Sequence, residues 1–296
     1  MKFGIGTYSF GGIASYLGLG PTLKEKFETI AGLGFTAVEL LPVDLDNDVE
    51  DIKRWAAETG LEIVSIHAEP SEEIVKKMAA LGGKYVILAG TPFNCKEEAI
   101  EVAHQLDAWA EMAEPYGIKI GYHNHSQEFF MDQGKSLLEW VIENSSKCYF
   151  QLDCGWAMNA GTYPPSFIRR YLNRFIAIHV KENCKVNGPG ERPASRHAQQ
   201  EARPNPFANV KEMPLEERKK ILEGFEARMK APTDGPVFNV QCKMGVQESN
   251  INWVEIKKAL DEQDFEAAWI VEREGFYGDH DECIRDDCQW LIENIH

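Results

Sequence analysis

A repeated transition, from a helical pattern through glycine into a short apolar run, limits the possible folds of this chain more than any other feature. It occurs four times: Gly34 precedes residues 35–40, Gly60 precedes 61–66, Gly117 precedes 118–122, and Gly82-Gly83 precedes 84–88 in a less regular copy. Glycine after a helix supplies a left-handed cap. A short apolar run is typical of a strand that is covered on both faces. The pattern therefore predicts helices that alternate with buried parallel strands.

Signals for further helices and strands extend this alternation over the whole chain. Residues 22–25 form a capping-box sequence that opens a helix through Ile30. After Asn94, apolar residues recur on one face of a helix predicted over 96–113. The remaining strand candidates are residues 2–7, 148–152, 175–180 and 268–271.

Eight strand candidates, seven of them followed closely by a helix, predict an α/β fold that closes into a (β/α)8 TIM barrel. An open, doubly wound sheet is the alternative, but no GxGxxG motif follows the first strand to favour it. A length of 296 residues suits one such barrel, so we expect residues 1–296 to form a single domain.

One long segment, at about 183–247, interrupts the alternation after the seventh strand. It is polar and contains seven prolines, and it includes a charged helix predicted over 215–230. Because barrel enzymes keep their chemistry at this end of the strands, the insertion is interpreted as a lid or a partner-binding arm. The alternative is a surface excursion with no part in catalysis.

The charge and the cysteines exclude some classes of protein. With 47 acidic and 31 basic residues the net charge is −16, which argues against nucleic acid binding. No run approaches the ~18 apolar residues of a membrane span, so no membrane partner is expected. The first residues resemble a strand rather than a signal peptide. Seven cysteines without a CxxC pair indicate a reducing compartment, by default the cytoplasm.

Side chains that can bind cations stand at the ends of four consecutive strands. They are His123, His125 and Glu128 at the fifth strand, Asp153 at the sixth, His179 at the seventh, and Glu272 and Glu274 at the eighth. In a parallel barrel these ends meet at one mouth. Each residue alone has an ordinary explanation, such as a helix cap or a solvated strand end. The joint pattern predicts a metal site, and carboxylates with imidazoles suit Mn, Zn, Co or Mg.

Six short motifs point to a known family. They are AVEL at 37–40, SIHA at 65–68, GYHNH at 121–125 followed by Glu128-Phe129, LDCGW at 152–156, HVKE at 179–182 and VERE at 271–274. Together they resemble the xylose isomerase-like barrel superfamily, whose members are often described as sugar phosphate isomerases/epimerases. The resemblance spans the chain apart from the insertion.

The resemblance implies one divalent metal ion (Mn, Zn, Co or Mg) bound by Asp153, His179 and Glu272. The family's fourth ligand is a carboxylate on the fifth strand, and His123 stands in its place here. Either His123 is the fourth ligand or Glu128 reaches back from the loop.

The implied reaction is isomerisation or epimerisation of a sugar, keto-sugar or cyclitol through an enediolate. A metal ion stabilises the enediolate, and a carboxylate or histidine ~3 Å from the carbon moves the proton. His125 and Glu128 are candidates for proton transfer or for supporting the ligands. Glu39, His67 and Lys181 are candidates for orienting substrate oxygens, although Glu39 and Lys181 would equally suit buried ion pairs. Trp156 and Phe10 are candidates for an apolar wall against a sugar ring, or for core positions.

The sequence allows three other functions. A metal-dependent lyase or dehydratase acting on an oxidised sugar or inosose is the main alternative, because an imidazole can also protonate a leaving group. The DNA-repair endonucleases of the superfamily are disfavoured by the net charge and by too few histidines for a trinuclear zinc cluster. A non-catalytic barrel subunit is the third. The expected partner is a small carbohydrate-like substrate, phosphorylated or not, and the resemblance implies a homo-oligomer.

Overall fold

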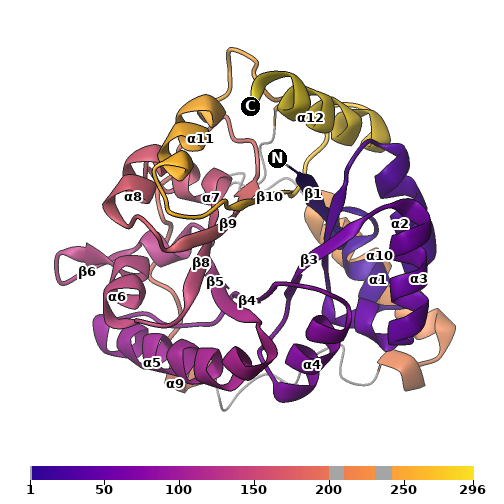
Figure 1. Ribbon diagram of the computed structural model, residues 1–296, viewed down its shortest axis with the longest axis horizontal. Coiled ribbons are helices and arrows are strands. Elements are labelled where there is room, and N and C mark those ends of the chain that lie inside the picture. Colours follow the sequence, from indigo (N-terminus) through magenta and orange to yellow (C-terminus); the bar gives the residue numbers. More distant parts are fainter. Residues whose placement is uncertain (1, 200–209, 231–241) are drawn as a thin grey trace.

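The computed structural model describes residues 2–199, 210–230 and 242–296. Eight parallel strands form a closed barrel in the order β1-β10-β9-β8-β5-β4-β3-β2, and helices surround it (Figure 1). The barrel strands are β1 Phe3–Gly6, β2 Ala37–Leu40, β3 Glu62–His67, β4 Tyr85–Ala89, β5 Lys119–His123, β8 Tyr149–Asp153, β9 Phe175–Val180 and β10 Ala268–Val271. The predicted TIM barrel is confirmed.

Closure of the barrel depends on β1, which pairs with β2 on one side and with β10 on the other. Ile5 lies opposite both Val38 and Val271. The neighbouring Gly4 leaves room for this approach, since a Cβ there would lie 2.8 Å from Ile270 Cδ1. The strands are buried on both faces, as the apolar runs in the sequence require.

The helices begin and end close to the predicted positions. The capping box of Thr22 and Glu25 opens α2, and α5 covers the predicted range 96–113. Gly60, with φ of 72°, supplies the left-handed cap expected after α3. The helices are α1 Gly12–Tyr16, α2 Leu23–Gly32, α3 Val49–Thr59, α4 Glu72–Ala80, α5 Lys96–Ala113, α6 Leu137–Asn144, α7 Cys154–Asn159, α8 Pro164–Arg170, α9 Arg196–Gln199, α10 Leu215–Lys230, α11 Trp253–Asp261 and α12 His280–Asn294.

The loops between the barrel strands and the helices contain short strands and 3-10 helices. A two-stranded hairpin pairs β6 with β7 in the loop after β5. Their bounds, with those of the 3-10 helices, are β6 Met131–Asp132, β7 Lys135–Ser136, η1 Thr7–Ser9, η2 Pro42–Asp46, η3 Glu114–Tyr116, η4 Gln127–Phe129 and η5 Val210–Glu212.

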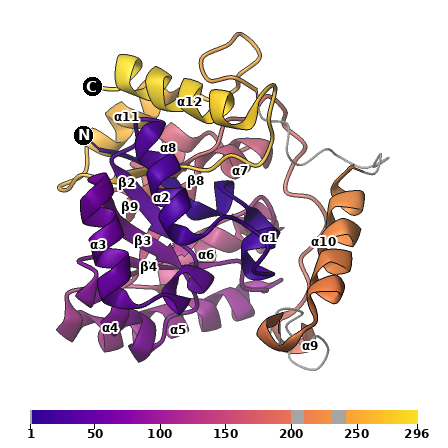
Figure 2. The same ribbon diagram turned by 90° about the vertical axis from the view of Figure 1, so that its right-hand side faces the viewer.

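The segment after β9 contains α9 and α10. Both helices lie at one end of the barrel, on the side where α1 lies (Figure 2). The helix predicted over 215–230 is confirmed as α10. Arg218 of this helix donates from Nη1 to the carbonyl of Leu17, 3.0 Å away, beyond α1. Residues 200–209 and 231–241 of the expected insertion lie outside the described residues, and its role as a lid or arm stays a prediction.

Candidate metal centre

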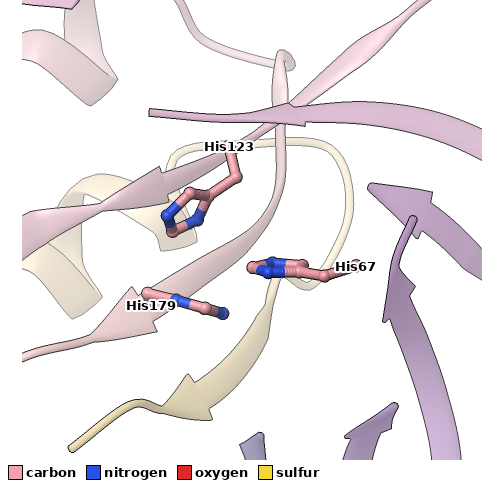
Figure 3. Close-up of side chains that lie close together, drawn as sticks. All are labelled: His67, His123 and His179. Atoms are coloured by element: carbon pink, nitrogen blue, oxygen red, sulfur yellow. The ribbon is translucent and has the colours of Figure 1, made fainter. Parts of the chain in front are cut away.

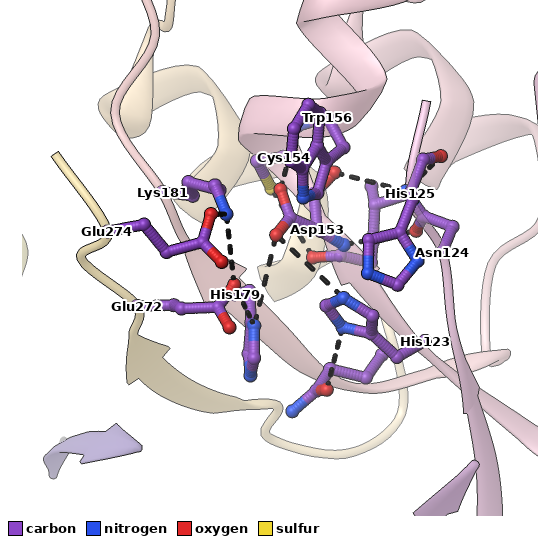
Figure 4. Close-up of polar contacts among 12 residues, drawn as sticks. His123, Asn124, His125, Asp153, Cys154, Trp156, His179, Lys181, Glu272 and Glu274 are labelled. Atoms are coloured by element: carbon purple, nitrogen blue, oxygen red, sulfur yellow. Dashed lines mark hydrogen bonds and ion pairs between the residues drawn. The ribbon is translucent and has the colours of Figure 1, made fainter. Parts of the chain in front are cut away.

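Four side chains of the kinds that bind cations, two imidazoles and two carboxylates, meet inside the mouth of the barrel. His123 ends β5, Asp153 ends β8, His179 lies in β9, and Glu272 follows β10 directly. Parallel pairing sets Asp153 opposite His179 and His179 opposite Ile270. One ligand atom from each of the four lies within 4.8 Å of the others, and Figure 4 shows the side chains converging from their strands.

The arrangement leaves a space that suits a cation. His179 Nδ1 lies 3.2 Å from Glu272 Oε2 and 3.9 Å from Asp153 Oδ2, and His123 Nε2 lies 4.0 Å from the same Asp153 oxygen. Asp153 Oδ1 caps α7 by accepting the backbone N–H of Trp156 at 2.7 Å. Asp153 Oδ2 is buried and accepts no hydrogen bond from any described residue. A buried carboxylate oxygen without a donor is costly, and a bound cation would satisfy it.

A second layer of polar side chains orients the two histidines. Glu39 Oε1 lies 2.7 Å from His179 Nε2, and Gln151 Oε1 lies 3.1 Å from His123 Nδ1. Both oxygens are acceptors, so each histidine donates its proton outward and turns its other nitrogen to the centre. Metal-binding histidines are commonly held in this way by a carboxylate or amide.

Gln151 is the member of this layer that sequence analysis missed. Its Nε2 donates to Glu39 Oε2 at 2.8 Å, and its Oε1 also lies 2.6 Å from His67 Nε2. The side chain is fully buried. The available signal was its position two residues before Asp153, which sets both side chains on the same face of one strand.

Asn124, in the middle of the GYHNH motif, was also missed. Its Oδ1 accepts the backbone N–H of Asp153 at 3.1 Å, and its Nδ2 donates to the Asp153 carbonyl at 3.3 Å. The amide therefore ties the end of β5 to the end of β8, beside two of the four clustered residues.

Three histidine rings lie side by side in the mouth. Figure 3 shows His67, His123 and His179 pointing toward one another. The rings of His67 and His179 are stacked, with centroids 4.9 Å apart and an interplanar angle of 19°. His67 Nε2 also lies 3.2 Å from Glu39 Oε1. His67 thus joins the layer that surrounds the four clustered residues.

The charges in the centre are strongly coupled. Burial raises the pKa of Asp153 to about 7, and nearby Glu272 adds to the effect. Burial alone would lower the pKa of His179, but Glu39 and Glu272 outweigh it and raise this pKa to about 10. Burial, together with His179 and His67, lowers the pKa of His123 well below its usual value. Without a metal ion, His179 therefore carries a proton on both ring nitrogens at neutral pH.

Glu39 is an ionised carboxylate with all of its acceptor capacity in use. It accepts a hydrogen bond from Ser65 Oγ at 2.6 Å, besides its contacts to His179, His67 and Gln151. Burial would raise its pKa, but His67 and His179 lower it to about 2. These contacts place Glu39 as a support for His179.

Lys181 forms a buried ion-pair network beside the centre. Its Nζ lies 3.3 Å from Glu272 Oε2, also contacts Glu274, and sits 4.6 Å from the centroid of the Trp156 ring. Gly155 is required below it, because a Cβ at residue 155 would lie 2.5 Å from the Lys181 carbonyl. Lys181 and Glu39 do not pair with each other. Lys181 pairs with Glu272 and Glu274, and Glu39 pairs with His179.

Glu128 lies outside the four-residue cluster. Its Oε1 accepts the hydroxyl hydrogen of Tyr122 at 2.8 Å, and its Oε2 accepts the backbone N–H of His125 at 2.8 Å. Of the two residues considered for the fourth position, the structure brings His123 into the cluster. Glu128 instead holds the loop that carries His125.

A cavity of about 650 Å³ opens above the centre. Its lining includes His67, His125, His179, Glu39, Glu272, Tyr8, Tyr16 and Arg196. Trp156 and Phe10 are not among the lining residues: Trp156 packs on His125, with centroids 6.1 Å apart, and Phe10 is buried against His280. Tyr8 and Tyr16 supply aromatic wall where Trp156 and Phe10 were expected.

Comparisons with known proteins agree with this architecture. The model of the family described as xylose isomerase-like TIM barrel matches residues 27–294. No curated protein matches the sequence.

Several solved structures share the fold at low sequence identity. A sugar phosphate isomerase/epimerase from Parabacteroides distasonis ATCC 8503 is 20% identical, with a TM-score of 0.66 over 98% of this chain and 93% of that one. A D-psicose 3-epimerase, solved in the presence of D-fructose, is 13% identical, with a TM-score of 0.59 over 100% and 99%. The probable 3-DHS dehydratase AsbF from Bacillus anthracis is 13% identical, with a TM-score of 0.61 over the full length of both chains.

Proposed function

This chain belongs to the xylose isomerase-like TIM barrel family, and from that premise we propose that it is a divalent-metal-dependent isomerase or epimerase of a sugar, keto-sugar or cyclitol. The observation that carries the proposal is the group of His123, Asp153, His179 and Glu272, with its unsatisfied Asp153 oxygen, beneath a polar cavity. The epimerases and isomerases among the similar structures support the substrate class.

We propose His123 Nε2, Asp153 Oδ2, His179 Nδ1 and Glu272 Oε2 as the ligand atoms of one divalent ion. Two imidazoles with two carboxylates suit Zn, Mn or Co better than Mg, which favours oxygen ligands. A bound ion would act as a Lewis acid and stabilise the negative charge that develops when a carbon next to a carbonyl loses its proton.

The chain's own residues then divide the remaining work. We propose His125 for proton transfer, because it lines the cavity and Glu128 fixes its backbone. His67 also faces the cavity, and burial lowers its pKa, so that it can accept a hydrogen bond from a substrate hydroxyl in its neutral form. We assign Glu39 the task of holding His179 and Lys181 the task of holding Glu272, since both are fully engaged there.

Elemental analysis of the purified protein is the first test. We expect about one equivalent of Zn, Mn or Co, lost in Asp153→Ala and retained in the control Asp51→Ala, which changes a half-exposed helix position. The metal-loaded protein should then incorporate solvent deuterium next to the carbonyl of a ketose or inosose, seen by NMR. Failure to bind any of the candidate ions would refute the proposal.

A lyase on the same platform is the second candidate. The observation that favours it is the pair of histidines, His123 and His125, at the end of β5, where the family's isomerases place a carboxylate. An imidazole can donate a proton to a leaving group, and a probable dehydratase is among the similar structures. Elimination would produce an unsaturated ketone with ultraviolet absorption, whereas isomerisation or epimerisation would not.

The compartment and the oligomeric state of the protein are proposed from fewer observations. No helix in the described parts of the chain has the length and apolarity that crossing a membrane requires. All seven cysteines lie in the described parts, where they are thiols rather than disulfides, and on that ground we propose the cytoplasm as the compartment. A homo-oligomer stays a prediction, which light scattering would test.

A further inference from the structure

We infer that Arg196 binds an anionic group of the substrate, a carboxylate or a phosphate, at the wall of the cavity beside Thr91. The inference rests on the proposed function for the sugar chemistry and adds the acidic group to it. Arg196 belongs to the segment after β9, so this segment would take part in substrate selection.

Arg196 is the only lysine or arginine among the described residues that line the cavity. Its Nη1 lies 3.4 Å from Thr91 Oγ1, at the long end of the hydrogen-bond range. No described carboxylate lies within ion-pair distance of its guanidinium. A guanidinium has five N–H donors in a planar fork, which matches a carboxylate or a phosphate.

The backbone at Arg196 is held in place by the start of α5. The segment 192–197, here called the strap, docks on the buried carboxylate of Glu98. Glu98 Oε2 accepts the backbone N–H of Arg196 at 3.0 Å and that of Asn94 at 2.9 Å, and Glu98 Oε1 contacts Ser195 Oγ. Because these bonds fix the backbone beneath it, the Arg196 side chain is presented to the cavity from a defined position.

The second arginine of the strap, Arg192, differs from Arg196 because its guanidinium is held by protein groups. Arg192 donates to the Asn94 carbonyl at 2.8 Å and to Asp132 Oδ1 at 3.2 Å, and its guanidinium stacks on the Phe130 ring at 4.9 Å. Its charge is used to hold the strap. Within residues 2–199, 210–230 and 242–296, the charge of Arg196 has no comparable structural partner, and the side chain lines the cavity instead.

The charged side chains that line the cavity are mainly acidic, and Arg196 partly offsets their negative potential. The chain carries a net charge of −16, and Glu39, Glu69, Glu272 and Glu274 all line the cavity. An anionic sugar would be repelled by this field unless cations opposed it. A metal ion at the centre would oppose it, and so does Arg196 beside Thr91. The two charges suit a substrate with its carbonyl at the metal and its acidic group at Arg196.

The test compares sugar binding to the wild-type protein and to Arg196→Ala by calorimetry, with and without Mn²⁺. The probes are glucuronate, galacturonate, glucose 6-phosphate, fructose 6-phosphate and, as neutral references, glucose and fructose. We expect Arg196→Ala to weaken binding of at least one anionic probe by about tenfold or more, as for the loss of a charge-assisted hydrogen bond. Binding of the neutral sugars should not change.

Two further variants keep the outcome interpretable. Arg54→Ala removes the same charge from an exposed helix position and should leave all affinities unchanged, and Arg196→Lys should restore part of the lost affinity. Loss with the uronates assigns a carboxylate, and loss with the sugar phosphates assigns a phosphate. If no anionic probe distinguishes wild type from Arg196→Ala, or if Arg54→Ala has the same effect, the inference is wrong. Arg196-dependent binding in a protein that holds no metal would overturn the metal proposal alone.

Discussion

At the scale of single residues, the proposed metal centre depends on two neighbours, the uncharged Gln151 and the ionised Glu39, as much as on its proposed ligands. Gln151 fixes the nitrogen that His123 presents, and Glu39 does the same for His179. Gln151 also donates to Glu39, so one amide links the supports of both histidines. Replacing it would leave both ligands in place but free to turn.

We therefore predict that Gln151→Ala weakens the affinity for Zn²⁺ or Mn²⁺ by about 10–100-fold, the usual cost of losing such a partner. Competition with a chelating indicator dye measures this. Gln289→Ala, on the exposed side of α12, is the matched control and should bind as the wild type does. Unchanged affinity in a folded Gln151→Ala protein would remove Gln151 from the site.

The pKa shifts of two ligands predict how metal binding depends on pH. Without metal, His179 holds a proton below about pH 10 and Asp153 holds one below about pH 7. Both protons must leave before these atoms can bind an ion. Affinity should therefore rise with pH, by about tenfold per unit between pH 7 and pH 10, and more steeply below pH 7.

Calorimetry at pH 8 in buffers of different ionisation enthalpy measures the protons released. We expect about one proton for each ion bound, mainly from His179. Binding without proton release would show that His179 is already neutral, contrary to the effect of Glu39 and Glu272 on its pKa.

At the scale of elements, buried glutamates anchor the segment after β9 at two places. Glu182 accepts from Ser249 Oγ at 2.6 Å and from Trp253 Nε1 at 3.0 Å, and so ties the end of β9 to the start of α11. Glu98 anchors the strap to α5. The strap is thus held to the barrel by side chains far away in the sequence.

We predict that Glu98→Ala releases the strap without unfolding the barrel. Three donors lose their acceptor, at a cost of about 1–3 kcal/mol for each group left buried. Hydrogen exchange followed by mass spectrometry should show faster exchange in peptides covering 192–197 and unchanged exchange in β5 and β8. Glu97→Ala, at the adjacent exposed position, should leave both regions unchanged. Equal protection of the strap in Glu98→Ala and wild type would rule out Glu98 as its anchor.

At the scale of the whole molecule, barrel closure brings together residues that are 149 positions apart, from His123 to Glu272 (272 − 123). A metal ion bound there would join β5, β8, β9 and the end of β10. Because that binding site exists only in the folded state, the ion should stabilise the entire barrel.

At a free metal concentration about 100 times Kd, the expected stabilisation is about 2.7 kcal/mol. For a chain of 296 residues that raises Tm by roughly 4 °C. Melting curves with metal and with EDTA measure the difference, which Asp153→Ala should abolish. An equal Tm with metal and with EDTA in the wild-type protein would contradict the site.

The sequence by itself determined the alternation of elements and the chemistry available at their ends. The helices at 96–113 and 215–230, the capping box at Thr22 and the eight strands were predictable because helix periods, caps and apolar runs are local properties. The positions of Asp153, His179 and Glu272 at the mouth followed from strand ends and the parallel fold.

Tertiary structure alone decided which side chains meet. It brought His123 into the cluster and turned Glu128 toward Tyr122, and it set Trp156 and Phe10 outside the lining of the cavity. It also placed Gln151 against His123, and it placed Arg196 at the mouth because the strap docks on α5. These outcomes depend on contacts between residues far apart in the chain, whose side-chain directions no local pattern encodes.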